Sequence, residues 1–254
     1  MLKTLDNALH ILTYFSKDRS QWGVRELAKE IGMNHSVVYR ILATFEHHGF
    51  LIQDKITQKY SLGFKLLEYG SIIRDRTKVT TVIYPILKQM AENSGETVFL
   101  SLRDGLQGVL LERADSPNPV KFTNSVGARS PLYVGATNRA MMAYLSQEEQ
   151  EMIIAQGLKT ITGKQITREQ LMENLIKIRQ NGWAYSEGEI TEATFGIGAP
   201  LLNVKDQVIA SVSISGPQYR MTQENFKKTL KILLQGRDQI QDFLLRHQVD
   251  ILLK

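Results

Sequence analysis

Cysteine is absent from the 254 residues of this chain, which excludes disulfides, thiolate nucleophiles and cysteine metal sites. Long apolar runs are absent too, and none approaches the roughly 20 residues that a membrane-spanning helix needs. The first residues, MLKTLDNALHIL, lack the order of a signal peptide. We therefore expect a cytoplasmic protein without a membrane partner.

Histidine is scarce, and its five occurrences leave the long stretch from Gly49 to Arg246 without one. That stretch cannot supply a histidine for a catalytic triad or a typical zinc site. The segment Ser186 to Glu189 holds two carboxylates, which we interpret as solvated loop charges. Gly196 and Gly198 form no nucleotide-binding motif, because no helix start follows them. We predict no enzyme activity, no metal site and no cofactor.

The composition is that of a folded protein with a mild excess of positive charge. The apolar fraction is 43%, the charged fraction 22% and the formal charge +5. A basic protein favours an anionic partner, but charge alone does not identify it.

Apolar spacing predicts three short helices near the N-terminus. In the first, Leu5, Leu9 and Leu12 form one helical stripe. Gly32 can end the second helix with a positive φ, and Asn34 can cap the third. Two helices joined by a short glycine turn are typical of a helix-turn-helix. The expected helices cover residues 4–15, 24–31 and 34–48.

The outer face of the third predicted helix suits a DNA groove. Ser36 and Tyr39 can bond phosphate oxygens, Val37 can touch a thymine methyl, and Arg40 can bind phosphate or a guanine edge. An alternative is that these are ordinary core helices with a solvated outer face. The adjacent His47 and His48 could suggest a metal site. We interpret them instead as the C-terminal end of this helix, where a positively charged imidazolium is favoured.

A short β-hairpin over residues 50–62 should form the wing of a winged helix-turn-helix. Its lysines can meet the DNA backbone, which adds affinity more than sequence choice. The predicted DNA-binding residues are Arg25, Asn34, His35, Ser36, Val37, Tyr39, Arg40, Thr44, Lys55 and Lys59.

The rest of the chain is predicted to be a linker helix followed by an α+β domain. We place the DNA-binding domain at residues 1–62, the linker helix at 63–78 and an effector-binding and oligomerisation domain at 79–254. In the last domain, Pro85 should kink or break the first helix. Asp104-Gly105 predicts a tight hairpin. The expected strands are 97–103, 106–113, 120–124, 197–204 and 207–215, and helices are expected at 79–93, at 140–144, around 171–181 and from 223 onward.

One predicted strand alternates valine, alanine and isoleucine with Ser211, Ser213 and Ser215. Its serine face fits either a polar pocket or the solvent side of a half-exposed strand.

Six segments together resemble the isocitrate lyase regulator (IclR) family over the whole chain. The segments are 24–28, 32–42, 49–51 with 60–63, 127–133, 181–185 and 198–200 with 212–217. The resemblance implies a C-terminal domain of profilin- or GAF-like fold that binds a small organic acid. It also implies a homodimer, or a dimer of such dimers, on a near-palindromic duplex operator, more often as a repressor than as an activator.

The family's effector pocket, carried over by the resemblance, falls on six residues of this chain. The backbone N–H groups of Ala136 and Thr137 would hold a carboxylate. Many relatives have cysteine where this chain has Gly196, and Asn138 is bulkier than the family pattern. The implied effector-binding residues are Ala136, Thr137, Ser186, Gly196, Ser213 and Ser215.

Two other functions remain open from the residues alone. One is an enzyme with an accessory nucleic-acid module, which the missing cysteines and histidines disfavour. The other is a winged helix that docks a protein, which would lack the strong salt dependence of DNA binding.

Overall fold

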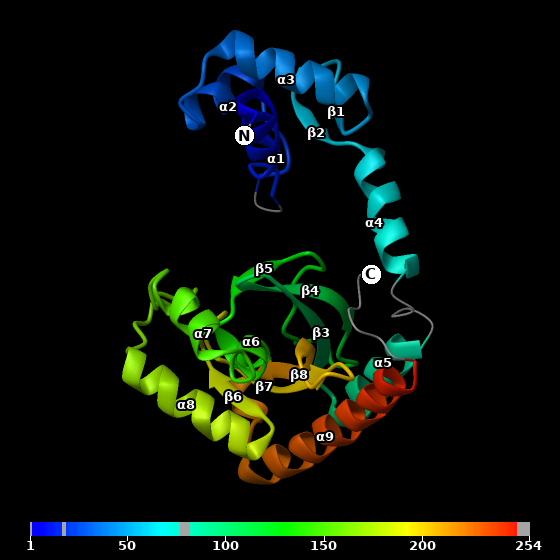
Figure 1. Cartoon of the computed structure of the whole chain (residues 1–254). Coiled ribbons are helices and arrows are strands. Elements are labelled where there is room, and N and C mark those ends of the chain that lie inside the picture. Colours follow the sequence, from blue (N-terminus) through cyan, green and yellow to red (C-terminus); the bar gives the residue numbers. More distant parts are fainter. Residues whose placement is uncertain (1, 17–18, 77–81, 248–254) are drawn as a thin grey trace. The chain divides into compact units, whose positions relative to one another are not determined.

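The N-terminal unit, Met1–Asp75, contains three short helices, a two-stranded sheet and most of a fourth helix. The computed structural model describes residues 2–16, 19–76 and 82–247 (Figure 1). The predicted winged helix-turn-helix is confirmed by the order of these elements. They are α1 Lys3–Leu12, α2 Val24–Glu30, α3 His35–His47, β1 Leu51–Gln53, β2 Tyr60–Leu62 and α4 Phe64–Arg76.

The turn between α2 and α3 is fixed by local chemistry. Gly32 has φ +66°, a conformation that costs glycine little. The Asn34 side chain then caps α3 by accepting the Ser36 N–H at 2.9 Å. Beneath the turn, the buried core of the unit includes Ile11, Trp22, Leu27, Val38, Leu42, Leu51 and Tyr60.

The leucine stripe of α1 is present, but its first two residues do not enter the core. Leu5 and Leu9 are 55% and 56% exposed, whereas Ile11 is completely buried. The helix therefore has two apolar sides, and only one is covered within this unit. Helical spacing alone cannot tell which of two stripes packs on the chain's own core.

The C-terminal unit, Arg76–Lys254, is built on one six-stranded sheet in which every neighbouring pair is antiparallel. The strand order is β5-β4-β3-β8-β7-β6. The α+β class with an antiparallel sheet is thus confirmed. The strands are β3 Thr97–Asp104, β4 Gln107–Ala114, β5 Arg129–Pro131, β6 Ala184–Glu187, β7 Thr194–Leu202 and β8 Val208–Pro217.

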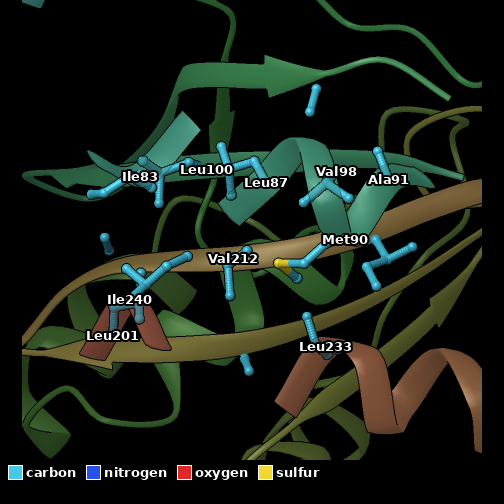
Figure 2. Close-up of a cluster of buried hydrophobic side chains, with 14 of the residues drawn as sticks. Ile83, Leu87, Met90, Ala91, Val98, Leu100, Leu201, Val212, Leu233 and Ile240 are labelled. Carbon is cyan, nitrogen blue, oxygen red and sulfur yellow. The ribbon is translucent and has the colours of Figure 1, made fainter. Parts of the chain in front are cut away.

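Two helices, α5 Tyr84–Ser94 and α9 Gln223–Arg246, cover one face of this sheet. Figure 2 shows Leu87 and Met90 of α5 and Leu233 of α9 meeting Val212 of β8 in the buried core. The helices approach closely at Gly236, where a Cβ atom would lie 2.2 Å from the Met90 sulfur. Because alternate residues of β8 point to this core, Ser211, Ser213 and Ser215 face the opposite side.

The opposite face carries α6 Gly135–Met142, α7 Gln147–Ile154 and α8 Arg168–Asn181 (Figure 1). The helix α6 lies on β6, β7 and β8. At Gly198 of β7 a Cβ atom would lie 2.9 Å from the Ala136 carbonyl group, so the helix backbone rests directly on the strand. Among the described helices, none is long and apolar enough to cross a bilayer.

One strand predicted for this unit is wrong. Residues 120–124 form no strand, and the outer strand is instead Arg129–Pro131. Arginine side chains take the carbonyls that a strand would use: Arg220 bonds Val120 O, and Arg113 bonds Asn124 O at 2.6 Å. Pro85, expected to kink or break this helix, lies in the first turn of α5, where its missing N–H has no helical partner. Residues 79–81 of the helix expected there lie outside the described residues.

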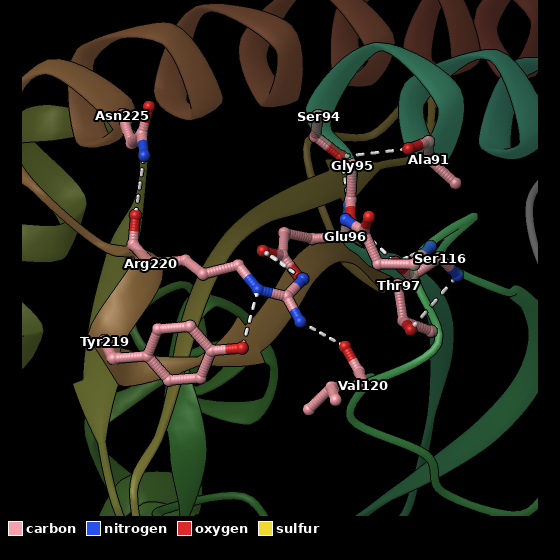
Figure 3. Close-up of polar contacts among 11 residues, drawn as sticks. Ala91, Ser94, Gly95, Glu96, Thr97, Ser116, Val120, Tyr219, Arg220 and Asn225 are labelled. Carbon is pink, nitrogen blue, oxygen red and sulfur yellow. Dashed lines mark hydrogen bonds and ion pairs between the residues drawn. The ribbon is translucent and has the colours of Figure 1, made fainter.

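A buried ion pair joins the start of β3 to the segment after β8 (Figure 3). Arg220 reaches both carboxylate oxygens of Glu96, at 3.0 and 3.1 Å. Burial raises the pKa of Glu96 despite the nearby guanidinium. Gly216 allows this approach, because a Cβ atom there would overlap the Glu96 carboxylate. The Asn225 amide, in the first turn of α9, donates to Arg220 O at 2.7 Å, which links the pair to that helix.

Candidate DNA interface and effector pocket

The outer face of α3 is exposed as predicted. Val38, Ile41 and Leu42 are buried on its inner side. Two hydroxyls on the outer face are engaged within the helix: the Ser36 hydroxyl donates to Asn34 Oδ1, and the Thr44 hydroxyl donates to Arg40 O, both at 2.7 Å. The exposed predicted residues are Asn34, His35, Ser36, Val37, Tyr39, Arg40 and Thr44.

The wing is a tight turn held by one carboxylate. Asp54 Oδ1 accepts hydrogen bonds from the backbone N–H groups of Ile56 at 3.0 Å and Thr57 at 2.7 Å. These bonds lower the pKa of Asp54, because they favour its charged form. Lys55 is exposed on this turn. Ile56 beside it is 93% exposed and was not among the predicted DNA-binding residues.

Arg25 is exposed on α2, and Lys59 is tied to the same helix. The Lys59 ammonium lies 3.5 Å from Glu26, whose carboxylate also lies 3.2 Å from Arg19. The hydrogen bond from the Gly23 N–H is the main cause of the lowered pKa of Glu26. Lys59 therefore has an internal counter-ion that a DNA phosphate would have to replace.

All six predicted effector-binding residues come together where α6 meets β6, β7 and β8. Ser186, Gly196 and Ser215 are direct neighbours across the three strands. The Thr137 hydroxyl donates to Ser213 Oγ at 2.7 Å, and the Ala136 N–H donates to Ser186 Oγ at 2.9 Å. The Ala136 N–H expected to hold a carboxylate is thus already bonded within the chain.

A small cavity of about 50 Å³ adjoins this cluster. Its volume is far below the roughly 300 Å³ of a typical ligand pocket, so only a very small molecule fits without movement. Aromatic and aliphatic side chains form much of its wall, and hydroxyls form part of its lining. Residues around it include Phe99, Ser101, Phe122, Thr137, Ile190 and Ser215.

A larger groove of about 510 Å³ lies elsewhere in the unit, beside Arg103 and Tyr144. None of the predicted effector residues lines it. Its Arg103 and Glu149 side chains already form an ion pair with each other. Of the two, only the smaller cavity has members of the cluster, Thr137 and Ser215, in its lining.

Glu189 departs from the prediction. We interpreted the carboxylates of residues 186–189 as solvated, which describes the exposed Glu187 but is wrong for Glu189. Glu189 caps α6 by accepting the Gly135 N–H at 2.8 Å and pairs with Arg139 at 2.5 Å. Val134, the residue before α6, provides no side-chain cap, so a carboxylate from a distant loop replaces it.

Comparison with known proteins identifies the chain. The family model "Bacterial transcriptional regulator IclR C-terminal" matches residues 73–242, and "IclR helix-turn-helix domain" matches residues 4–55. The regulator KipR of Bacillus subtilis is 32% identical and covers 87% of this chain and 89% of its own. The chain belongs to the IclR family. It is a DNA-binding transcription regulator.

Other IclR-family proteins agree. The transcriptional repressor IclR of Escherichia coli is 23% identical over 88% of this chain and 83% of its own. An IclR regulator from Alicyclobacillus acidocaldarius has the same fold, with a TM-score of 0.84, 24% identity and coverage of 96% and 99% of the two chains. These relatives are named as regulators, which confirms that the chain is not an enzyme.

A further IclR homologue, from Microbacterium hydrocarbonoxydans, was crystallised with 4-hydroxybenzoate. It matches with a TM-score of 0.80 and 21% identity, over 95% of this chain and 98% of its own.

Two polar features of the C-terminal unit were not predicted. One is the Glu189–Arg139 pair, which joins residues far apart in sequence. The other is Ser211, whose fully buried hydroxyl has no hydrogen-bond partner among the described residues. The alternating serines of β8 pointed to its face, but only the structure shows that no described residue bonds the Ser211 hydroxyl. Metal ligands do not cluster anywhere in the described part of the chain.

Proposed function

We propose that this regulator is a repressor whose operator binding is controlled by a small organic acid held beside α6. The observation that carries the proposal is that the six residues carried over from the family pocket cluster where α6 meets the sheet. Two of them, Thr137 and Ser215, line a cavity there, on a chain whose α3 presents a polar outer face. The repressor role is supported by a relative named as one, the Escherichia coli repressor IclR. The acid is supported by the homologue crystallised with 4-hydroxybenzoate.

DNA binding is assigned to α3 and the wing, with Arg40 as the principal base or phosphate contact. Arg40 is exposed on α3, and a guanidinium can bind the paired acceptors of guanine. Lys55 and Lys59 would add phosphate contacts and salt dependence. The remaining proposed contacts are Arg25, Asn34, His35, Ser36, Val37, Tyr39 and Thr44.

The proposed assembly is a homodimer, or a dimer of two such dimers. We place it in the cytoplasm, together with the operator DNA that it binds. Leu5 and Leu9 lie one helical turn apart on α1 and are more than half exposed. Covering them with the same stripe of a second copy would remove this apolar surface from water. A dimer would present two α3 helices to a near-palindromic operator.

We divide the functions among residues 1–62 for DNA, 63–78 as a linker helix and 79–254 for effector and oligomer contacts. Of these, residues 1, 17–18, 77–81 and 248–254 lie outside the described part.

Fluorescence anisotropy on duplexes selected by the wild-type protein from a random pool tests the DNA assignment. We expect Arg40→Ala to weaken binding about 5- to 150-fold, because a bidentate guanine contact contributes about 1–3 kcal/mol. Arg246→Ala is the matched control, an exposed arginine of α9. Equal binding by all three proteins would refute the assignment of α3.

The acid is tested by a thermal-shift screen of small carboxylates, since a ligand that binds only the folded state raises the melting temperature. The absence of any stabilising acid would refute the effector class.

A further inference from the structure

Polar groups at the N-terminal end of α6 are mostly bonded within the chain. The Gly135 N–H is taken by Glu189, the Ala136 N–H by Ser186, and the Thr137 hydroxyl by Ser213. The Asn138 amide donates to acceptors on three other residues, among them Ser130 Oγ at 2.7 Å. These groups position the helix, and a ligand would have to compete for them.

Ser211 differs from all of these. It is fully buried on β8, and its hydroxyl has no hydrogen-bond partner among the described residues. Leaving a buried hydroxyl unbonded costs about 1–3 kcal/mol. Such a group in a native fold calls for a partner that the chain itself does not supply.

The direction of Ser211 follows from its strand. Val212 and Ile214 belong to the core under α5 and α9, so Ser211, Ser213 and Ser215 share the α6 face. The bond from Thr137 to Ser213 and the presence of Ser215 in the cavity wall agree with this orientation. Ser211 thus continues the row of hydroxyls that begins at the cavity.

Ser101 connects Ser211 to the cavity. It lies directly opposite Ser211 on the neighbouring strand β3, and it lines the cavity. Directly opposed residues of an antiparallel pair point to the same face, with Cβ atoms about 4.5–5.5 Å apart. A single oxygen atom between the two side chains could bond both hydroxyls.

The cavity wall also limits what that oxygen can be. No lysine, arginine or histidine is among the described residues that line it. The nearby Arg139 is already paired with Glu189. The positive end of α6, beside Thr137, is the one feature of the described wall that favours an anion, so a charged group next to Ser101 instead would be buried without compensation, which is unfavourable. A hydroxyl is neutral and can both donate to one serine and accept from the other.

We propose that Ser101 and Ser211 form a subsite for a hydroxyl group of the effector, which makes the preferred effector a small hydroxy acid. This rests on the proposed acid effector and specifies its chemistry. The carboxylate lies toward Thr137 and the positive end of α6, and the hydroxyl lies between the two serines. The volume of about 50 Å³ restricts the acid to a very short chain unless the wall moves.

The test compares acids that differ by one hydroxyl: glycolate against acetate, and 3-hydroxypropionate against propionate. Calorimetry and thermal shift give the affinity of each for the wild type, Ser211→Ala and Ser101→Ala. The control is Ser71→Ala, an exposed serine of α4 in the other unit. In the wild type and the control, we expect the hydroxy acid of at least one pair to bind about tenfold more tightly, which is the value of one well-made hydrogen bond.

In Ser211→Ala that ratio should fall to near one, and in Ser101→Ala it should fall in part. Ser211→Ala should also melt at a higher temperature than the wild type without ligand, because the unbonded hydroxyl is gone. A ratio that survives in Ser211→Ala overturns the proposal, and so does a lower melting temperature, which would show that the hydroxyl already has a partner.

The outcomes separate this proposal from the one on which it rests. If acetate and propionate bind but the hydroxyl adds nothing, only the subsite is overturned. If no acid of either kind binds, both the subsite and the acid effector are overturned. Operator binding by the wild type is measured separately and does not depend on either result.

Discussion

Replacing Glu189 with alanine would remove two contacts of α6 at once. Its carboxylate accepts the Gly135 N–H at 2.8 Å and pairs with Arg139 at 2.5 Å. The two side chains are only 13% and 9% exposed, so solvent screens the pair weakly. The variant would leave Arg139 buried without its carboxylate.

The expected destabilisation is about 3 kcal/mol. Removing one partner of a buried ion pair costs about 3–5 kcal/mol, and we take the lower end for a structural reason. Arg139 keeps its hydrogen bond to Tyr133 O at 2.9 Å, and Asn174 Oδ1 lies 3.4 Å from it. For a unit of this size, about 3 kcal/mol lowers the melting temperature by roughly 6–12 °C.

Urea and thermal unfolding can measure this destabilisation in the C-terminal unit alone. The chain has two tryptophans, Trp22 in the first unit and Trp183 in the second. A Trp22→Phe background therefore makes fluorescence report on the C-terminal unit alone. Glu192→Ala, on the same loop but exposed, is the matched control and should stay within about 0.5 kcal/mol of its parent. If Glu189→Ala and Glu192→Ala have the same free energy of unfolding, the stabilising role given to the buried pair is wrong.

Three further predictions concern other parts of the chain. Gly198→Val should destabilise the C-terminal unit by about 1–3 kcal/mol, seen in the urea midpoint, because α6 backbone fills the Cβ position. Leu9→Glu should shift the assembly toward monomers in sedimentation velocity, because it charges the exposed stripe of α1. For Glu96, the raised pKa means that the folded state holds the proton more tightly than the unfolded chain does. The free energy of unfolding should therefore fall as pH rises from about 4.5 through that raised pKa, and Glu96→Gln should lack this fall in urea titrations at several pH values.

Sequence patterns predicted well what depends on neighbouring residues. The outer face of α3 and the wing followed from helical spacing and turn residues. The hairpin at Asp104-Gly105 and the serine face of β8 followed from alternation and turn chemistry. The helix α7 was missed although the sequence carried its signal. Ser146 and Glu149 form a capping box, and that spacing is readable without a structure.

Long-range partners explain what the sequence could not provide. Glu189 caps a helix 54 positions away, and Arg220 pairs with a residue 124 positions away. No periodicity records such pairs. The strand expected at residues 120–124 failed for this reason, since Arg220 takes a carbonyl that the pattern assigned to a sheet. Leu5 and Leu9 show a related limit, because an apolar stripe does not reveal whether its own unit covers it.

The measurement that most directly tests the account is a titration of labelled operator duplex with the wild-type protein, with and without the acid that stabilises it best. If the protein is a repressor released by its ligand, the acid should weaken operator binding by about 5- to 150-fold, the usual range of coupling between two sites. Thr137→Val, which removes the hydroxyl bonded to Ser213, should reduce that change while still binding the duplex without acid. Operator affinity that is the same with and without a bound acid would contradict the central claim that this pocket controls DNA binding.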